Sequence, residues 1–376
     1  MKDFRIHYIT IAGGLGNQML SYSLWYYLTR TKKIKAKLSP IAEGLRDHNK
    51  LEINILFPET ETINEEASSL KNYRKLCSST NRYLNGISKI LGIKRQIDIS
   101  RILLNPMIVF PHYKTYTFMP QIIKNIRQIF EFPQDNDERN LKLIKEMEEN
   151  QSISIHVRRG DYQSNLAWRF LLGDICEKQY YDDAITYIKT IFSNPQFYIF
   201  SDDTQWVKQN LHLECATYIN WNQGKNSFRD MQLMTHCKAN IIANSTFSLM
   251  GTWLNKHNDC IHIAPSKWTN NNPDLSYKKY VPSNWITIDN SQPFVSIIIS
   301  ENIKNADKII RSISQQTISD YEIILPKEYN LHPKFKDKCI KIGIQATGHH
   351  IINIDNENTW NSKDRYCLQK LLIHIL

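Results

Sequence analysis

Two adjacent arginines stand between a histidine and an aspartate in the segment His156-Val157-Arg158-Arg159-Gly160-Asp161-Tyr162. The apolar run before it predicts a strand over Ser152–Val157, and alternate residues of a strand face the same side. His156 and Arg158 therefore share one face, and Arg159 faces the other. An arginine without an anionic partner at the end of a buried strand destabilises the fold, and a guanidinium group matches phosphate oxygens well. We expect Arg158 to bind a phosphate and an Arg159–Asp161 ion pair to brace the loop.

A second candidate is the run Asn244-Ser245-Thr246-Phe247-Ser248, which follows an apolar strand and begins a predicted helix. The first turn of a helix offers N–H groups that lack intrahelical partners, and the helix dipole favours an anion there. Ser245 and Thr246 could add hydroxyl groups to such a site. The alternative is plain N-capping, which serine and threonine perform in many helices.

The third candidate is the glycine-rich run Gly13-Gly14-Leu15-Gly16-Asn17-Gln18-Met19 between a strand and a helix. Glycines at this point allow a positive φ and a close approach of a ligand. A dinucleotide fingerprint would need a third glycine and an acidic residue after the next strand, and both are missing. A tight strand-to-helix turn is the alternative interpretation.

Paired acids follow a strand in Phe200-Ser201-Asp202-Asp203. They do not form the Asp-x-Asp pattern that metal-dependent sugar transferases commonly use. Asp202 and Asp203 are expected to cap a helix or to hold a base or a ribose. The seven cysteines are widely spaced without a Cys-x-x-Cys pair, which predicts reduced thiols and no zinc site. We expect neither a metal nor a cofactor.

These candidates lie at the ends of strands that alternate with helices, which predicts an α/β fold with parallel sheets. The opening reads as strand Ile6–Ala12, helix Asn17–Thr31 and strand Ile34–Leu38, and residues 41–134 show few strand signals. The second half predicts strands Ser152–Val157, Gln196–Phe200, Ala216–Ile219, Ala239–Ala243 and Cys260–Ala264, with helices Tyr180–Ile191, Asp203–Asn210, Phe228–His236 and Thr246–Asn255.

The chain divides into three predicted parts: an N-terminal domain over 1–148, a second domain over 149–290 and a C-terminal appendage over 291–376. The appendage predicts strand Phe294–Ser300, helix Lys304–Gln316 and strand Tyr321–Leu325, followed by a polar and irregular remainder.

The composition is that of a basic globular chain, with a net charge of +10, 41% hydrophobic residues and a pI of about 9.1. Such a charge suits an anionic partner: a phosphorylated substrate, a membrane surface or a nucleic acid. No nucleic-acid-binding motif stands out. The sequence shows neither a signal peptide nor a run of ~20 apolar residues. We therefore expect a cytoplasmic protein that contacts the inner membrane face at most peripherally.

Together, the segments Gly13–Met19, His156–Tyr162, Ser201–Asp203 and Asp230–Trp253 resemble those of bacterial α-1,2-fucosyltransferases of glycosyltransferase family 11. The resemblance covers Phe4–Thr287. It implies a GT-B-like architecture, with two Rossmann-like domains facing a cleft, and inverting transfer of L-fucose from GDP-fucose to a galactose-terminated or lipid-linked glycan. The implied catalytic residues are Arg158, His156 and Asp161. The implied donor-binding residues are Arg158, Arg159, Asp202, Asp203, Asn244, Ser245, Thr246 and Phe247, and the implied acceptor-side residues are Gly14, Gly16, Asn17 and Gln18.

The appendage more weakly resembles the opening of a family 2 glycosyltransferase, through Val295–Ile299 and Asp320–Leu325. The acidic cluster expected after the second of these strands is missing, which indicates a non-catalytic docking element. Two other functions stay open: an inactive nucleotide-sugar-binding module of a polysaccharide assembly complex, and a nicotinamide-dependent oxidoreductase.

Overall fold

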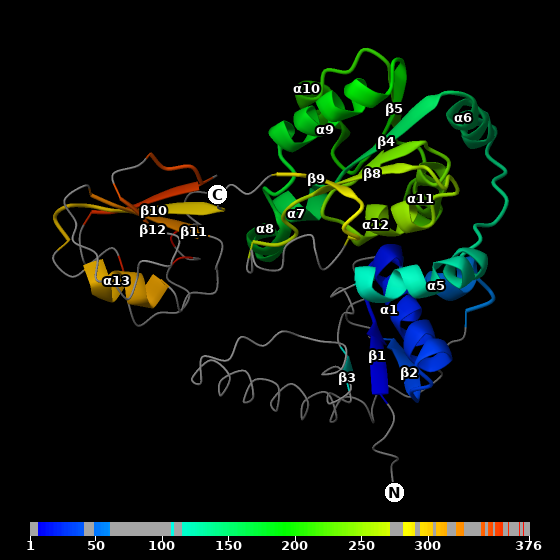
Figure 1. Ribbon diagram of the computed structural model, residues 1–376, viewed down its shortest axis with the longest axis horizontal. Helices are drawn as coiled ribbons and strands as arrows, with labels where there is room; N and C mark the ends of the chain where they lie inside the picture. Colours follow the sequence, from blue (N-terminus) through cyan, green and yellow to red (C-terminus); the bar gives the residue numbers. More distant parts are fainter. Residues whose placement is uncertain are drawn as a thin grey trace, which may run out of the picture.

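The computed structural model describes residues 7–40, 49–60, 107–108, 115–270, 281–289, 294–303, 306–313, 321–326, 340–342, 345–348, 350–355, 360, 368 and 371. These residues form three α/β units, each built on a parallel sheet (Figure 1). The expected α/β class, with two parallel-sheet units followed by a smaller C-terminal unit, is confirmed. The three sheets lie within the three predicted parts of the chain, whose boundaries we keep as a proposal.

The N-terminal unit has a central strand, β1 (His7–Ile11), between parallel β2 (Ala36–Pro40) and β3 (Met107–Ile108). Helix α1 (Leu15–Tyr26) connects β1 to β2 and continues into a π-helical turn, η1 (Tyr27–Thr31). The predicted strand, helix and strand are therefore confirmed. Helix α1 begins two residues earlier than expected, because Gly14 takes an extended conformation at its N-cap. The unit also contains α2 (Ile53–Leu56) and α5 (Thr115–Ile129).

The second unit is a six-stranded parallel sheet in the order β6-β5-β4-β7-β8-β9. Its five predicted strands are confirmed to within two residues. Strand β9 and the short helices α7 and α8 were not predicted, because their segments are short and lack clear periodicity. The strands are β4 (Gln151–Val157), β5 (Pro195–Ser201), β6 (Ala216–Ile219), β7 (Ala239–Ile241), β8 (Ile261–Pro265) and β9 (Ile286–Ile288).

Helices cover both faces of this sheet, as expected for a doubly wound unit (Figure 1). They are α6 (Glu138–Glu149), α7 (Gly160–Ser164), α8 (Leu166–Leu172), α9 (Lys178–Ile191), α10 (Thr204–Asn210), the 3₁₀ turn η3 (Gly224–Asn226), α11 (Phe228–Met234) and α12 (Thr246–Trp253).

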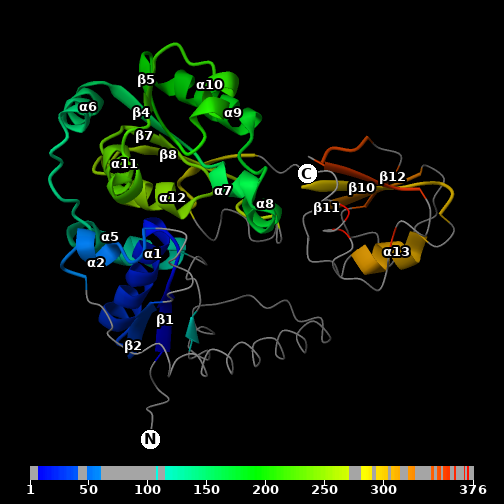
Figure 2. The same ribbon diagram turned by 180° about the vertical axis from the view of Figure 1, so that it is seen from behind.

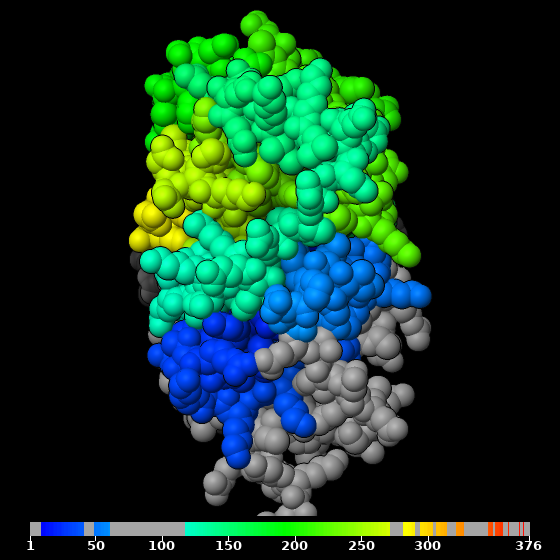
Figure 3. Space-filling model, turned by 90° about the vertical axis from the view of Figure 1, so that its right-hand side faces the viewer, coloured from blue at the N-terminus to red at the C-terminus, as the bar shows by residue number. Residues whose placement is uncertain are grey.

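The first two units share an apolar core. One cluster of buried side chains includes Met19 of α1 together with Met231 of α11 and Met250 of α12. Figure 2 shows α1 directly beneath α12, and Figure 3 shows the connection from α5 to α6 running over the surface from one unit to the other. Leu249 and Met250 are both fully buried and belong to the same cluster.

The C-terminal unit is a four-stranded parallel sheet in the order β12-β11-β10-β13. Strand β10 (Val295–Ile299), helix α13 (Ala306–Ile313) and β11 (Tyr321–Leu325) match the predicted elements. The expectation of an irregular remainder is wrong, because β12 (Ile340–Ile342) and β13 (His350–Ile354) complete the sheet. Strand β13 was missed because its apolar residues are interrupted by Asn353 and its outward Ile351 is 47% exposed. The unit has an apolar core of its own.

Candidate functional site

The order of strands reverses beside β4. From β4 the chain proceeds to β5 and β6 on one side, and then returns to β7 on the other side. Ligands of open parallel sheets bind outside the carboxyl ends of the strands at such a reversal. The residues that follow β4 are Arg158–Asp161, and those that follow β7 lead to Asn244–Thr246. Two of the predicted segments therefore meet at this point of the sheet.

Arg158 is held by two carboxylates. Its Nη2 lies 2.8 Å from Asp161 Oδ1, and its Nη1 lies 2.9 Å from Asp202 Oδ2. The guanidinium group also lies 5.5 Å from the ring centre of Tyr162. The side chain of Arg158 remains 30% exposed, so part of it is accessible to a ligand. The predicted Arg159–Asp161 pair is wrong, since Asp161 follows the turn of α7 back toward Arg158.

Gly160 allows this arrangement. A Cβ atom at Gly160 would lie 2.7 Å from Asp202 Oδ2, so a larger residue would displace the carboxylate that holds Arg158. The other oxygen of Asp202, Oδ1, accepts a hydrogen bond of 2.8 Å from the backbone N–H of Arg159. Asp202, which follows β5, therefore connects the C-terminal end of β5 to that of β4.

Arg159 occupies a different environment, away from Arg158. Its guanidinium group stacks on Trp206 at 4.3 Å from the ring centre and donates to Glu177 Oε1 at 3.2 Å. Asp203 Oδ2 lies 3.6 Å from Arg159 Nε, and Asp203 Oδ1 accepts from the backbone N–H of Trp206 as the N-cap of α10. Arg159 is 14% exposed. It therefore braces β4 against α9 and α10, and the expected capping role of Asp203 is confirmed.

His156 lies behind Arg158 and is 7% exposed. Its ring packs against Phe247 of α12 with ring centres 5.6 Å apart. Burial lowers the pKa of His156 to about 4, and the positive charge of Arg158 adds to this effect, while Asp202 opposes it. The imidazole is therefore neutral near pH 7. Its Nδ1 atom is buried and has no hydrogen-bond partner among the described residues, so it has bonding capacity left for a ligand.

The N-terminus of α12 lies against the glycine run of the N-terminal unit. Ser245 is the N-cap, and its Oγ accepts from the backbone N–H of Phe247 at 3.3 Å. Thr246 Oγ1 donates to Asn17 Oδ1 at 2.6 Å. A Cβ atom at Gly16 would lie 2.5 Å from the carbonyl group of Thr246. The beginnings of α1 and α12 therefore meet, and both present N–H groups of a first helical turn.

Two predicted residues serve to fix the loops. Asn244 is buried, and its Nδ2 donates to the carbonyl oxygens of Leu172 and Trp268. Gln18 is fully buried; its amide donates to Gly13 O and Lys50 O and accepts from the backbone N–H of Glu52. The expectation that the Gln18 side chain lines a cleft is therefore wrong: every polar atom of its amide is already bonded to backbone.

Sequence reasoning missed three side chains around the arginines. Glu177 is the N-cap of α9, Tyr162 lies in α7 and Trp206 in α10, and each contacts one of the two arginines. Trp206 lies three residues after Asp203, the N-cap of α10. This spacing was the one sequence signal that could have placed Trp206 near the site. Burial raises the pKa of Glu177, and the neighbouring Arg159 works against that rise.

Within the part of the chain that the structure describes, no three His, Cys, Asp or Glu side chains gather into a group that could hold a metal ion. Cys176, Cys215, Cys237 and Cys260, the described cysteines, are all free thiols. Among the same described residues, no helix is both long enough and apolar enough to cross a bilayer.

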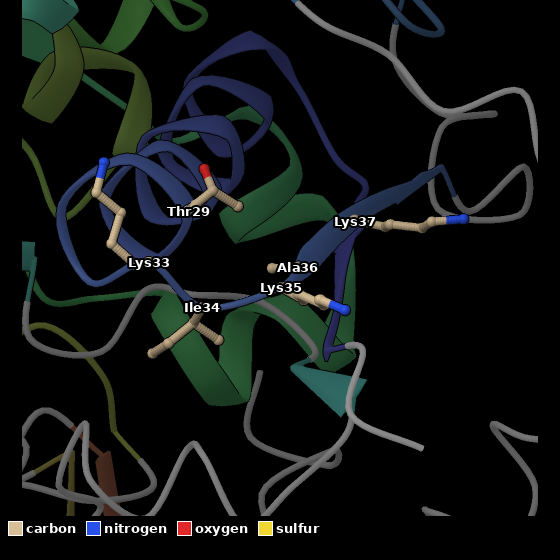
Figure 4. A pocket seen from close by; sticks show the side chains of 6 residues that line it. All are labelled: Thr29, Lys33, Ile34, Lys35, Ala36 and Lys37. Carbon is tan, nitrogen blue, oxygen red and sulfur yellow. The ribbon is translucent and has the colours of Figure 1, made fainter. Parts of the chain in front are cut away.

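An open hollow in the N-terminal unit is lined by Thr29, Ile34, Ala36 and three lysines (Figure 4). It lies at the edge of the sheet where β2 begins, opposite the glycine run that follows β1. The amines of Lys33, Lys35 and Lys37 do not converge on one point (Figure 4). This hollow is therefore separate from the site at β4 and β7.

Residues 2–289 match the model of a family described as glycosyl transferase family 11. An α-1,2-colitosyltransferase of Escherichia coli is 28% identical over 292 residues, covering 74% of this chain and 97% of that protein. The O-antigen biosynthesis glycosyltransferase WbnK of Escherichia coli is 28% identical over 310 residues, covering 75% of this chain and all 100% of that protein.

More distant similarities were also found. Galactoside α-(1,2)-fucosyltransferase 2 of Gorilla gorilla gorilla is 24% identical over 159 residues, covering 40% of this chain and 45% of that protein. Among solved structures, fucosyltransferase NodZ from Bradyrhizobium aligns with a TM-score of 0.38 at 14% identity, over 66% of this chain and 91% of that one.

Proposed function

The chain belongs to glycosyltransferase family 11, and on this premise we propose that it transfers L-fucose from GDP-β-L-fucose to the 2-hydroxyl of a terminal galactose. The anomeric centre is inverted, and no metal takes part. Relatives named for α-1,2-colitosyl transfer, for O-antigen biosynthesis and for galactoside α-1,2-fucosyl transfer support this linkage and a surface-polysaccharide acceptor.

One observation carries the proposal: a partly exposed arginine after β4 and the N-terminus of α12 after β7 occupy the same reversal point of the sheet. Departure of GDP breaks the bond between C1 of fucose and the β-phosphate oxygen, and leaves an additional negative charge on the diphosphate. Fixed donors aimed at a developing charge are a large source of catalysis. Arg158 and the first N–H groups of α12 would stabilise that charge, while the Thr246 hydroxyl holds Asn17 beside them.

The acceptor oxygen attacks C1 from the opposite face, forms the new glycosidic bond and loses its proton. Asp161 is unsuited to take that proton, because its carboxylate is engaged by Arg158 at 2.8 Å. The neutral His156 retains a buried, unpartnered Nδ1, which suits a hydrogen bond to the donor. Proton transfer to solvent as the bond forms agrees with a transition state in which departure of GDP leads.

Purified protein should be incubated with GDP-fucose, a GDP-linked colitose donor, other sugar nucleotides and NAD, each with a set of β-galactosides. We expect GDP release and a new glycoside only with the GDP-linked 6-deoxy sugars, with GDP-fucose preferred. The linkage and the anomeric configuration are read by NMR. Preference for the colitose donor would reassign the donor within the same site. Binding of GDP-fucose without turnover would favour an inactive nucleotide-sugar-binding module, and binding of NAD in place of GDP an oxidoreductase.

A further inference from the structure

The C-terminal unit is joined to the segment that leaves the candidate site. Phe170 of α8 is 6% exposed and belongs to the apolar core of the C-terminal unit, with its ring centre 6.4 Å from that of Phe294. Among the described residues, it is the one member of that cluster from outside the C-terminal unit. In Figures 1 and 2 the C-terminal unit lies beside α7 and α8. The side chain of Phe170 from the second unit is therefore inserted into the apolar core of the C-terminal unit.

Asp174 forms the polar half of the same contact. His350 Nε2, at the start of β13, lies 3.0 Å from Asp174 Oδ2. The same carboxylate accepts from Gln163 of α7 at 2.9 Å and from Arg169 of α8 at 3.2 Å. Asp174 also has a φ of 54°, a left-handed conformation that a non-glycine residue keeps only when its surroundings hold it.

Asp174 is the acceptor in these bonds. Burial works to raise its pKa, but the hydrogen bonds from His350 and Gln163 and the charge of Arg169 together hold that pKa below its ordinary value. Asp174 is therefore a carboxylate, and His350 donates from Nε2. One carboxylate thus links the C-terminal unit to α7 and to α8.

The segment 160–174, which contains α7 and α8, also borders both halves of the candidate site. It contains Asp161, which holds Arg158, and Gln163 lies only two residues further along α7. At its other end, the carbonyl oxygen of Leu172 accepts from Asn244 Nδ2 at 3.0 Å, in the loop that leads into α12. A shift of the segment 160–174 would therefore move both Arg158 and the N-terminus of α12.

We propose that the C-terminal unit positions the diphosphate site by fixing the segment 160–174 through Phe170 and through the His350–Asp174 hydrogen bond. Phe170, Asp174 and His350 are positioning residues, since none of them contacts the site directly. The family match ends at residue 289, before β10, so this device is an addition to the family region. The proposal rests on the proposed function only in taking the ligand to be a GDP-linked sugar.

The full-length chain and four variants test the proposal. Phe170→Ala removes the aromatic ring that enters the C-terminal core, and His350→Ala removes the hydrogen bond to Asp174. His350→Gln is the conservative variant, because its amide can still donate to Asp174. Ile351→Ala is the matched control, since Ile351 follows His350 on β13 but is 47% exposed. Each protein is measured for GDP affinity, for kcat and KM of the donor, and for amide hydrogen exchange of residues 160–174.

We expect Phe170→Ala and His350→Ala to speed exchange in 160–174 and to weaken GDP binding about 5- to 10-fold, a usual size for coupling between sites. His350→Gln should recover most of the affinity, and Ile351→Ala should match the wild type. Donor KM should rise more than kcat falls. The His350 variants decide the matter if Phe170→Ala does not fold.

Faster exchange in 160–174 with unchanged GDP affinity would overturn the proposal, and so would an equal loss of affinity in Ile351→Ala. A wild-type chain that binds no GDP would overturn the proposed function instead. The exchange measurement needs no nucleotide, so unchanged exchange in His350→Ala would by itself refute the docking of 160–174 by the C-terminal unit.

Discussion

Two chemically identical side chains leave β4 and enter different environments. Arg158 is 30% exposed while two carboxylates hold it, whereas Arg159 is 14% exposed and lies over the ring of Trp206. A planar guanidinium group satisfies both settings, since it can chelate a phosphate and can also stack on an aromatic ring. Lysine would keep the charge and lose both geometries.

We predict opposite outcomes for lysine at the two positions. Arg158→Lys should cost on the order of 3 kcal/mol of transition-state stabilisation, or ~10²-fold in rate, because the two-pronged donor toward the leaving diphosphate is lost. Its melting temperature should fall less than its rate, because Arg158 is 30% exposed and the charge of lysine can still pair with Asp161 and Asp202 in contact with water. Arg159→Lys should lower the free energy of unfolding by about 1–3 kcal/mol, because Glu177 and Asp203 are left poorly paired. Initial rates, GDP affinity and thermal unfolding on both variants are the measurements.

A stable, inactive Arg159→Lys beside an unstable Arg158→Lys that binds GDP normally would reverse the two assignments. In that case Arg159 would be the phosphate ligand, and the exposed surface of Arg158 would have no function in donor binding.

His156 should make the protein sensitive to acid. Its folded pKa of about 4 lies below the unfolded value of 6.5, so the unfolded state binds the extra proton between these values. Stability is therefore fully present above pH 6.5 and is lost as the pH falls toward 4, by up to about 3 kcal/mol. His156→Gln should flatten this dependence, measured by denaturant unfolding across pH 4–7.

His262 provides the control. Burial likewise lowers its pKa to about 4, and its ring packs on Trp285 rather than at the candidate site. His262→Gln should flatten the pH dependence to a similar extent and leave GDP affinity unchanged, whereas His156→Gln should also weaken GDP binding. Equal GDP affinity in both variants would remove His156 from the donor site.

Asp202 and Asp203 are already engaged by other groups. Asp202 binds Arg158 and the backbone of Arg159, and Asp203 caps α10. Carboxylates neutralised in this way are poor ligands for a divalent cation. We therefore predict that transfer persists in excess EDTA. Turnover that disappears on chelation and returns with manganese or magnesium would show that these pairs rearrange around a metal.

At the level of elements, the meeting of α1 and α12 depends on the absence of a side chain. The Cβ of an alanine at Gly16 would lie 2.5 Å from the backbone of Thr246, which cannot move aside as the end of a flexible side chain can. The hydrogen bond between Thr246 Oγ1 and Asn17 at 2.6 Å fixes the same approach. Both contacts set the distance between the first two units at the candidate site.

Gly16→Ala should consequently reduce transfer strongly and lower the free energy of unfolding by about 1–3 kcal/mol, the usual cost of overpacking. Gly251→Ala is the matched control, because it is also a helical glycine but its Cβ would meet Met231 Cγ at 3.3 Å, a flexible side chain. The control should stay within about 1 kcal/mol of wild type, since alanine favours helix. Activity and unfolding curves compare the two, and near-normal transfer by Gly16→Ala would contradict the importance of this contact.

The sequence predicted helices and strands better than it predicted the partners of individual side chains. Alternating strands and helices identified the strands of the six-stranded sheet except Ile286–Ile288, because apolar runs bounded by turns are a local signal. The alternation of β4 placed Arg158 and Arg159 apart, but the partner of Asp161 depends on the turn of α7 and on Asp202, 41 residues later in the chain. Likewise, the resemblance implied an acceptor-side role for Gln18, and the sequence could not show that its side chain is buried, because its partners Lys50 and Glu52 are distant in sequence.

At the level of the whole molecule, the three α/β units are joined in two different ways. The first two share an apolar core, while the third has its own core and holds the segment 160–174 through Phe170 and His350. The three units are therefore unequal: the first two form one continuous body, and the third is attached to it through a small contact beside the site.

Removal of the third unit tests this arrangement. A chain ending at Asp289 should keep its fold and part of its GDP-fucose-dependent transfer, because all the candidate site residues precede that point. Its GDP affinity should fall about 5- to 10-fold, since Asp174 loses His350 and Phe170 loses its surroundings. Exposed Phe170 should promote aggregation, and Phe170→Ser in the shortened chain should restore solubility without restoring affinity. Light scattering, GDP titration and initial rates separate these effects, and a soluble shortened chain with full GDP affinity would show that the third unit does not position the site.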